Sequence, residues 1–176
     1  MQAVLTGLVA VFGTIVGSIV TFIFQRKTAE RAERFARDEW LLQQRMAAYS
    51  AFTEVLLDFR AAQFGRWYRL RDDPDGEKGA QFIAARDESY RLRAAANHAM
   101  LRVQLLAHDG RLVHLAGEAV RSAAQMPASP DKDDLKARGE AARAALEAFV
   151  ATAADVITTV GQPRHHSPEL GPDPQE

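Results

Sequence analysis

The hydrophobic and polar positions of this chain divide it into one uncharged run and a series of helical patterns. Residues 3–24 carry no charged side chain and are apolar on every face, whereas later apolar positions recur at helical spacing. At about 1.5 Å per residue the run reaches about 33 Å as a helix, enough to cross a hydrocarbon core about 30 Å thick. The pattern predicts a single N-terminal transmembrane helix over residues 3–24.

Two other interpretations fit this run less well. A cleaved secretory signal has a basic start, a short apolar core and a small-residue cleavage site. Here Met1 and Gln2 supply no basic side chain, and the run ends in the bulky residues 22–24. A buried helix of a soluble protein needs neighbours on all its faces, and the remaining chain is too small to surround it. We therefore predict a retained anchor.

Basic residues directly after the run predict its orientation. They are Arg26, Lys27, Arg31, Arg34 and Arg37, and none precedes the run. The positive-inside rule then places the N-terminus outside and residues 25–176 in the cytoplasm, as a single-pass protein of the cell membrane. The chain has no cysteine, which fits a reducing compartment. Interleaved acidic residues offset most of the basic charge, which favours a topology signal over a lipid-binding patch.

Small residues on one face of the run predict self-association. Gly13 and Gly17 form a GxxxG pattern, and Thr21 continues the same face. Small residues at this spacing let two helix backbones approach closely in lipid, where packing drives association. We therefore expect a homo-oligomer. Because glycine is also common in membrane helices that do not pair, the pattern leaves a monomeric anchor open.

From residue 26 to about residue 71 the pattern predicts one long helix whose apolar positions repeat every seven residues. The repeated positions are Phe35, Leu42, Tyr49, Leu56, Gln63 and Leu70, and the stripe is widened by Met46, Phe52, Phe59 and Trp67. Charged residues interrupt the second set of apolar positions that a regular coiled coil needs beside these repeated positions. The stripe therefore suits a bundle helix better than a regular two-stranded coiled coil.

Turn residues at 72–76 end this helix and predict an antiparallel connection. A second helix is predicted over about residues 77–107, with one apolar face. That face consists of Ile83, Tyr90, Ala94, Leu101 and Leu105. Asp109 and Gly110 then interrupt the pattern, and a third helix is predicted over about residues 111–125.

A fourth helix is predicted after Pro127. Ser129 is placed at its N-cap and Pro130 in its first turn, and the helix ends at Gly161. Residues 162–176 are rich in proline and are predicted to be disordered. The predicted fold class is all-α: a transmembrane helix over 3–24 that continues into an antiparallel three- to four-helix bundle over 25–161 with a long first helix.

The bundle shows no pattern that predicts an active site, a cofactor site or a metal site. The acidic turn at 72–76 fails the EF-hand spacing, and His108 and His114 share no face of one helix. The chain has no cysteine, phosphate-binding glycine loop, nucleophile elbow or H-E-x-x-H sequence. We therefore expect no enzymatic activity, no cofactor and no bound metal.

One segment superficially resembles a nucleic-acid surface. Arginines alternate there with aromatic side chains, at Arg60, Phe64, Arg66, Trp67, Tyr68, Arg69 and Arg71. Phe64 and Trp67, however, fall at the spacing of core positions. The formal net charge of −1 also argues against direct contact with nucleic acid.

The order of these features resembles the KilB-type plasmid transfer and spread membrane proteins of actinobacteria. The resemblance rests on GTIVGSIVTFIFQRKTAERAERFARDEW at 13–40 and RDESYRLRAAANHAMLRVQLLA at 86–107, and it covers most of residues 1–160. It implies a membrane-anchored, non-enzymatic accessory of plasmid transfer, which acts by self-association and by contacts with a DNA translocase or other plasmid spread proteins. It transfers no site residue. The alternative is a chromosomal envelope scaffold or signalling accessory unrelated to plasmids.

Overall fold

The computed structural model describes the backbone of residues 2–161 and the side chains of residues 25, 27–28 and 32–159. The helices are α1 (Gln2–Asp72), α2 (Ala80–Leu106), α3 (Gly110–Gln125) and α4 (Lys132–Gly161), with 3₁₀ turns η1 (Gly76–Lys78) and η2 (Met126–Ala128). Within the described backbone there is no strand. The predicted all-α class and its long first helix are confirmed.

The chain divides into two compact units, Met1–Gln43 and Gln44–Glu176. α1 is the described element of the first unit. There Phe35 is 74 % exposed and Trp40 is 57 % exposed. The prediction that Phe35 belongs to a buried stripe is therefore wrong, because its own unit supplies no second helix to cover it.

The predicted transmembrane segment, residues 3–24, lies in α1, but its side chains are outside the described residues, and so are those of Gly13, Gly17 and Thr21. The same holds for the predicted tail, 162–176, and for two of the basic residues, Arg26 and Arg31. Lys27, Arg34 and Arg37 are exposed. Among the described residues, no helix is both long and apolar enough to span a bilayer. The anchor, its orientation and the domain boundaries stay predictions.

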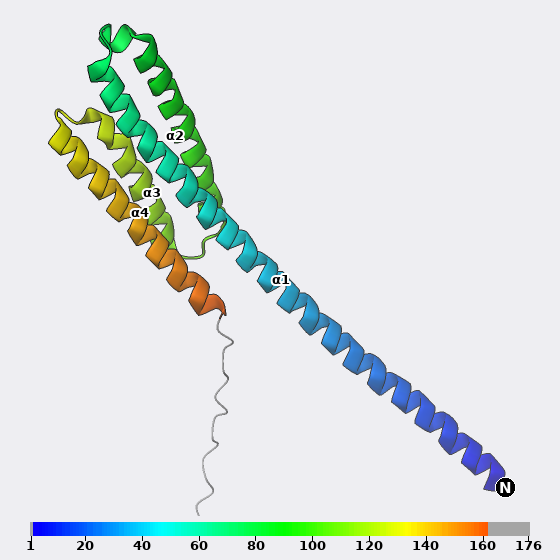
Figure 1. Ribbon diagram of the computed structural model, residues 1–176. Coiled ribbons are helices and arrows are strands. Elements are labelled where there is room, and N and C mark those ends of the chain that lie inside the picture. The colour runs from blue at the N-terminus through cyan, green and yellow to red at the C-terminus, as the bar shows by residue number, and fades with distance from the viewer. Residues whose placement is uncertain (1, 162–176) are drawn as a thin grey trace, which may run out of the picture. The chain divides into compact units, whose positions relative to one another are not determined.

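In the second unit, α1 from residue 44 onward packs with α2, α3 and α4, and successive helices run in opposite directions (Figure 1). Phe52, Phe59 and Phe149 are fully buried at its centre. The Phe149 ring from α4 lies edge-on to Phe52, with ring centres 4.8 Å apart. The heptad pattern is confirmed at its buried positions Tyr49, Phe52, Leu56, Phe59, Gln63 and Trp67.

The orientation of α2 differs from the prediction. Its buried residues are Phe82, Ser89, Leu92, Ala96 and Val103. The predicted face is exposed instead, at 36 % for Ile83, 51 % for Tyr90 and Leu101, and 85 % for Leu105. A buried polar pair helps to set this rotation, since the Ser89 hydroxyl donates to Gln63 Oε1 of α1 at 2.7 Å. A pairing of this kind cannot be read from apolar periodicity.

The start of α4 also differs from the prediction. The backbone N–H of Asp134 donates to Asp131 Oδ1 at 2.8 Å, so Asp131 caps the helix. Ser129 is buried at the end of η2, and its hydroxyl has no hydrogen-bond partner among the described residues. The prediction of Ser129 as the cap is wrong because η2 comes between α3 and α4 and moves the helix start beyond Pro130.

The assignment of Asp131 as the N-cap of α4 predicts different effects on stability for substitutions at Asp131 and at Ser129. Asp131→Ala should lower the free energy of unfolding by about 1 kcal/mol, because it leaves a backbone donor of the first turn unpaired. Asp131→Asn should retain most of that stability, since an amide oxygen also caps, whereas Ser129→Ala should change little. Thermal unfolding of the full chain in mild detergent, followed by circular dichroism, measures all three. A larger loss from Ser129→Ala than from Asp131→Ala would contradict the assignment.

Candidate interaction surface

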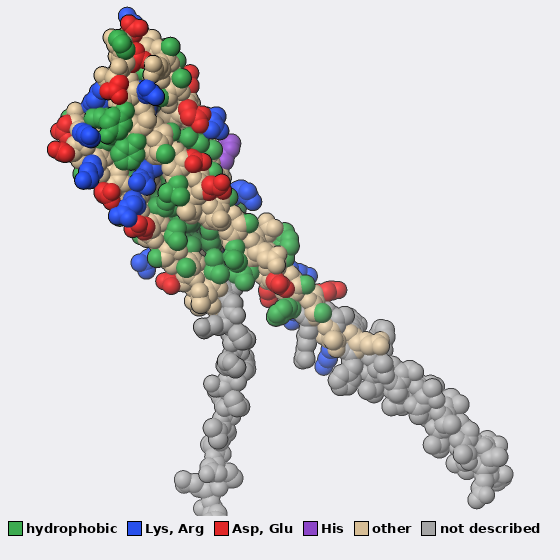
Figure 2. All heavy atoms as spheres, in the orientation of Figure 1, with side chains coloured by type: hydrophobic (Ala, Val, Ile, Leu, Met, Phe, Trp, Pro, Cys, Tyr) green, Lys and Arg blue, Asp and Glu red, His purple; other side chains and the backbone are tan. Residues whose placement is uncertain are grey.

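An apolar groove lies between α1 and α4 on the surface of the bundle unit. It has a volume of about 510 Å³ and is open to solvent along its length. We call it the α1–α4 groove; its lining includes Met46, Tyr49, Thr53 and Leu57 from α1, and Phe149, Val150, Ala153, Ala154 and Ile157 from α4. Figure 2 shows hydrophobic side chains gathered on this face near the end of α4, with charged side chains around them.

The groove exists because each helix has more apolar positions than the core can cover. Tyr49 and Phe149 form its floor, and the partly exposed Met46, Leu57 and Val150 form its edges. The prediction that Met46 widens the buried stripe is therefore wrong: at the groove edge its side chain is 49 % exposed. Large exposed apolar patches of this kind mark interaction sites in soluble domains.

Four residues with polar side chains line the groove, of which Ser50 and Glu54 of α1 are exposed. The Thr53 hydroxyl donates to the Tyr49 carbonyl at 2.9 Å. Burial raises the pKa of the Tyr49 phenol, so that group is neutral at physiological pH. Its hydroxyl has no hydrogen-bond partner among the described residues. Apart from Ser50 and Glu54, the exposed side chains of the groove are aliphatic or methionine side chains, above the buried rings of Tyr49 and Phe149.

Charged residues border the continuation of the groove toward the middle of α4. This second hollow is lined by Thr53, Leu57, Arg60, Arg143, Leu146, Glu147, Val150 and Ala151. Arg143 donates to Glu140 at 2.9 Å and to Glu147 at 3.0 Å, so its charge is paired within α4. The rim is thus polar and the floor apolar, as in protein–protein contact sites.

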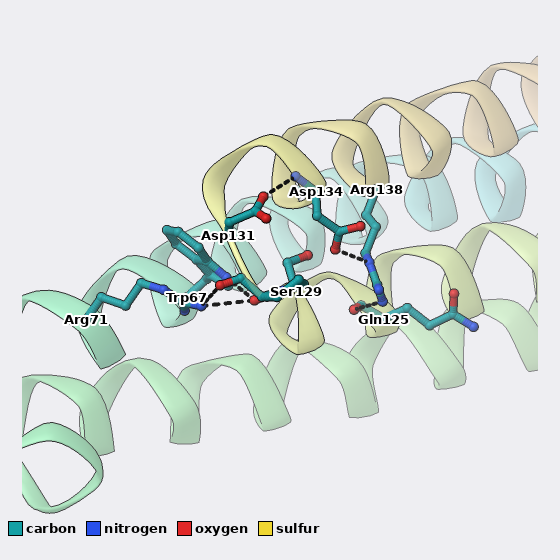
Figure 3. A network of polar contacts seen from close by, with 8 residues as sticks. Trp67, Arg71, Gln125, Ser129, Asp131, Asp134 and Arg138 are labelled. Carbon is teal, nitrogen blue, oxygen red and sulfur yellow. Dashed lines mark hydrogen bonds and ion pairs between the residues drawn. The ribbon is translucent and has the colours of Figure 1, made fainter.

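The arginine and aromatic cluster of α1 has a structural role. Trp67 is buried, and its indole N–H donates to the carbonyl of Ser129 at 2.9 Å (Figure 3). The Arg71 guanidinium stacks 3.6 Å from the Trp67 ring centre and donates to the carbonyls of Ser129 and Pro130. These contacts tie the α3–α4 connection to the end of α1 and confirm the expectation that Trp67 is a core residue.

Two more arginines of the cluster lie against aromatic rings of the same chain. The guanidinium of Arg66 is 5.3 Å from the Tyr90 ring centre, and that of Arg60 is 5.9 Å from the Phe64 ring centre. Arg69 donates to Gln81 Oε1 at 2.7 Å. The side chains that suggested nucleic-acid contact are therefore engaged within the bundle.

The described histidines lie apart from one another. His108 Nδ1 is 2.8 Å from the guanidinium of Arg45, which also donates to the carbonyl of Leu106 at the end of α2. His114 lies 3.4 Å from Glu118. Among the described residues, no three metal-ligating side chains converge. The apolar pattern of the sequence predicted neither the contact of Arg45 with the end of α2 nor the α1–α4 groove.

The second unit is thus an all-α helical bundle that carries an apolar groove between α1 and α4. The KilB plasmid transfer protein family matches residues 46–158. The chain is 30 % identical to Protein KilB of Streptomyces lividans over 149 aligned residues. The alignment covers 85 % of this chain and 95 % of that protein. No solved structure shows a significant match.

The chain therefore belongs to the KilB plasmid transfer protein family, and the resemblance identified from the sequence is confirmed. Family membership supports a plasmid-related role. The segment that matches the family, residues 46–158, begins at Met46, the first residue that lines the α1–α4 groove. It ends one residue after Ile157, the last residue that lines the groove.

Proposed function

We propose that this protein is a membrane-anchored, non-enzymatic accessory of plasmid transfer that works by binding other proteins. The observation that carries the proposal is that the family match, residues 46–158, spans the bundle and the whole α1–α4 groove. In this scheme residues 3–24 hold the protein in the cell membrane with the N-terminus outside, and the bundle lies in the cytoplasm.

The groove suits one kind of partner. An amphipathic helix or another apolar segment can lay its apolar side against the exposed side chains of Met46, Leu57 and Val150 between the two helices, as in helix-in-groove recognition. We propose that this segment belongs to a DNA translocase or to another plasmid spread protein. Direct contact with nucleic acid is not part of the proposal, because Arg66 and Arg71 are stacked within the bundle.

Self-association in the membrane is the second element of the proposal. Gly13, Gly17 and Thr21 are spaced four residues apart in the sequence, the spacing of one helix face. Close packing of two such faces would bring two bundles to one site and raise the local concentration of their grooves.

Complementation of a deletion strain tests the proposal. We expect loss of the gene to reduce plasmid movement between and within the hyphae of an actinobacterial host, and the full chain to restore it. A chain that lacks residues 3–24 should fail, because the bundle is no longer held at the membrane. A chain with an unrelated transmembrane helix of the same orientation should restore movement if the segment is only a tether, and should fail if the Gly13 and Gly17 face is needed.

Cell fractionation and protease accessibility of the tagged C-terminus control for expression and orientation. Unchanged plasmid movement in the deletion strain would overturn the transfer role and favour a scaffold unrelated to plasmids. Recovery of a soluble full-length chain would overturn the anchor while leaving the groove as the site of partner binding.

A further inference from the structure

A separate hollow lies between α2 and α3 on the surface of the bundle unit. It has a volume of about 430 Å³ and shares no lining residue with the α1–α4 groove. We call it the α2–α3 hollow; it is lined by Arg93, Asn97 and Met100 from α2 and by Gly117, Val120, Arg121, Ala124 and Gln125 from α3. Its lining contains two basic residues and no acidic one, so its charge suits an anion.

The polar side chains of the hollow are all available to a ligand. Each helix supplies one arginine and, four residues later, one amide: Arg93 with Asn97 on α2, and Arg121 with Gln125 on α3. Residues four apart lie on the same face of a helix. In the described part of the chain, none of these four side chains has a hydrogen-bond or ion-pair partner. Two guanidiniums and two amides therefore offer N–H donors to one space.

The acidic residues of α2 and α3 do not neutralise this charge, because each lies against another side chain. The pairs are Asp87 with Arg86 at 3.2 Å, Glu88 with Arg91 at 2.6 Å and Glu118 with His114 at 3.4 Å. A carboxylate or a phosphodiester carries one negative charge, whereas a phosphate monoester carries about −1.5 to −2 near pH 7. The monoester is thus the group that balances two free guanidiniums.

Gly117 keeps the α3 side of the hollow open. A Cβ atom at this position would lie 3.1 Å from a terminal guanidinium nitrogen of Arg121, so the arginine lies back along α3 over the glycine. Glycine is a weak helix former, but here its missing side chain leaves room for the guanidinium. The apolar part of the lining consists of the buried Val120 and the half-buried Met100 and Ala124.

We propose that the α2–α3 hollow binds a phosphate monoester group, held between the guanidiniums of Arg93 and Arg121. The amide N–H groups of Asn97 and Gln125 are further donors. A guanidinium binds phosphate oxygens through two parallel N–H···O bonds, and these charge-assisted bonds are stronger than neutral ones. A soluble molecule or the headgroup of a lipid such as phosphatidic acid can carry this group, and both would use the same donors.

Titration calorimetry of the purified full chain in mild detergent tests the site, in phosphate-free buffer of low ionic strength. The two probes are glycerol 3-phosphate and short-chain phosphatidic acid in the micelles. Arg93→Gln and Arg121→Gln should each raise the Kd about tenfold or more. Arg102→Gln is the matched control, because Arg102 is an exposed arginine of α2 outside the hollow and has no ion-pair partner in the described residues. It should leave the Kd unchanged.

Two further measurements separate a built site from general attraction of anions. Gly117→Leu keeps both charges but places a side chain against Arg121, and should also raise the Kd about tenfold. Circular dichroism checks that each variant keeps its helices. Acetate, which carries one charge and two oxygens, should bind at least about tenfold more weakly than the monoester.

The outcomes also distinguish the two sources of the group. Saturable binding of glycerol 3-phosphate that depends on Arg93 and Arg121 supports the site with a soluble ligand. Binding of phosphatidic acid alone, with the same dependence, supports it with a lipid headgroup. The proposal would be overturned by the absence of saturable binding of either probe, by an equal loss from Arg102→Gln, or by acetate binding as tightly as the monoester.

Discussion

Replacing Phe149 with alanine should lower the free energy of unfolding of the bundle by about 3–5 kcal/mol. The ring is fully buried, and its centre lies 4.8 Å from Phe52 and 6.0 Å from Tyr49, both edge-on. Truncation removes this burial and leaves a cavity between α1 and α4. Since domains of this size are commonly stable by about 5–15 kcal/mol, much of the bundle's stability would be lost.

The adjacent residue supplies the matched control. Val150 is 43 % exposed at the edge of the α1–α4 groove, so Val150→Ala should cost well under 1.5 kcal/mol. Denaturant unfolding of the full chain in mild detergent, followed at the helical signal, compares the two variants. Equal and small losses would contradict the placement of Phe149 at the centre of the core.

Introducing charge into the α1–α4 groove should abolish the proposed transfer function while leaving the bundle folded. Leu57 and Val150 are 46 % and 43 % exposed on opposite edges of the groove. Changing both to glutamate places two carboxylates where an apolar partner segment would have to remove their water, a cost that binding cannot recover. Because both carboxylates reach solvent in the free protein, the free energy of unfolding should change by only about 0.5 kcal/mol per site.

Plasmid movement and capture of the partner from crosslinked membranes are the measurements. Ala61→Glu with Ala144→Glu is the matched control, because both residues are exposed on α1 and α4 but do not line the groove. We expect the groove variant to behave like the deletion strain and the control to behave like the natural chain. Normal plasmid movement with the groove variant would exclude the groove as the partner site.

Much of the fold could be predicted from the sequence because it depends on local rules. The heptad positions from Tyr49 to Trp67 recur where one face of α1 meets other helices, and this repeat predicts burial without knowledge of the partners. Turn residues marked the end of α1, and Asp109 with Gly110 marked the start of α3, where Asp109 accepts from the Arg111 N–H at 2.8 Å. Each turn or cap signal depends on residues that are close together in the chain, so it can be recognised from the sequence alone.

The sequence by itself therefore determined the helical class, the order of the helices, the repeat that forms the core of α1 and the uncharged run before it. Only the tertiary structure decided which of two apolar stripes α2 buries, that Asp131 rather than Ser129 caps α4, and that α1 and α4 leave a groove between them. Each of these depends on partners far apart in the chain, such as Gln63 with Ser89 and Trp67 with Ser129. A helical repeat records that a residue is apolar, whereas burial depends on which neighbour reaches it.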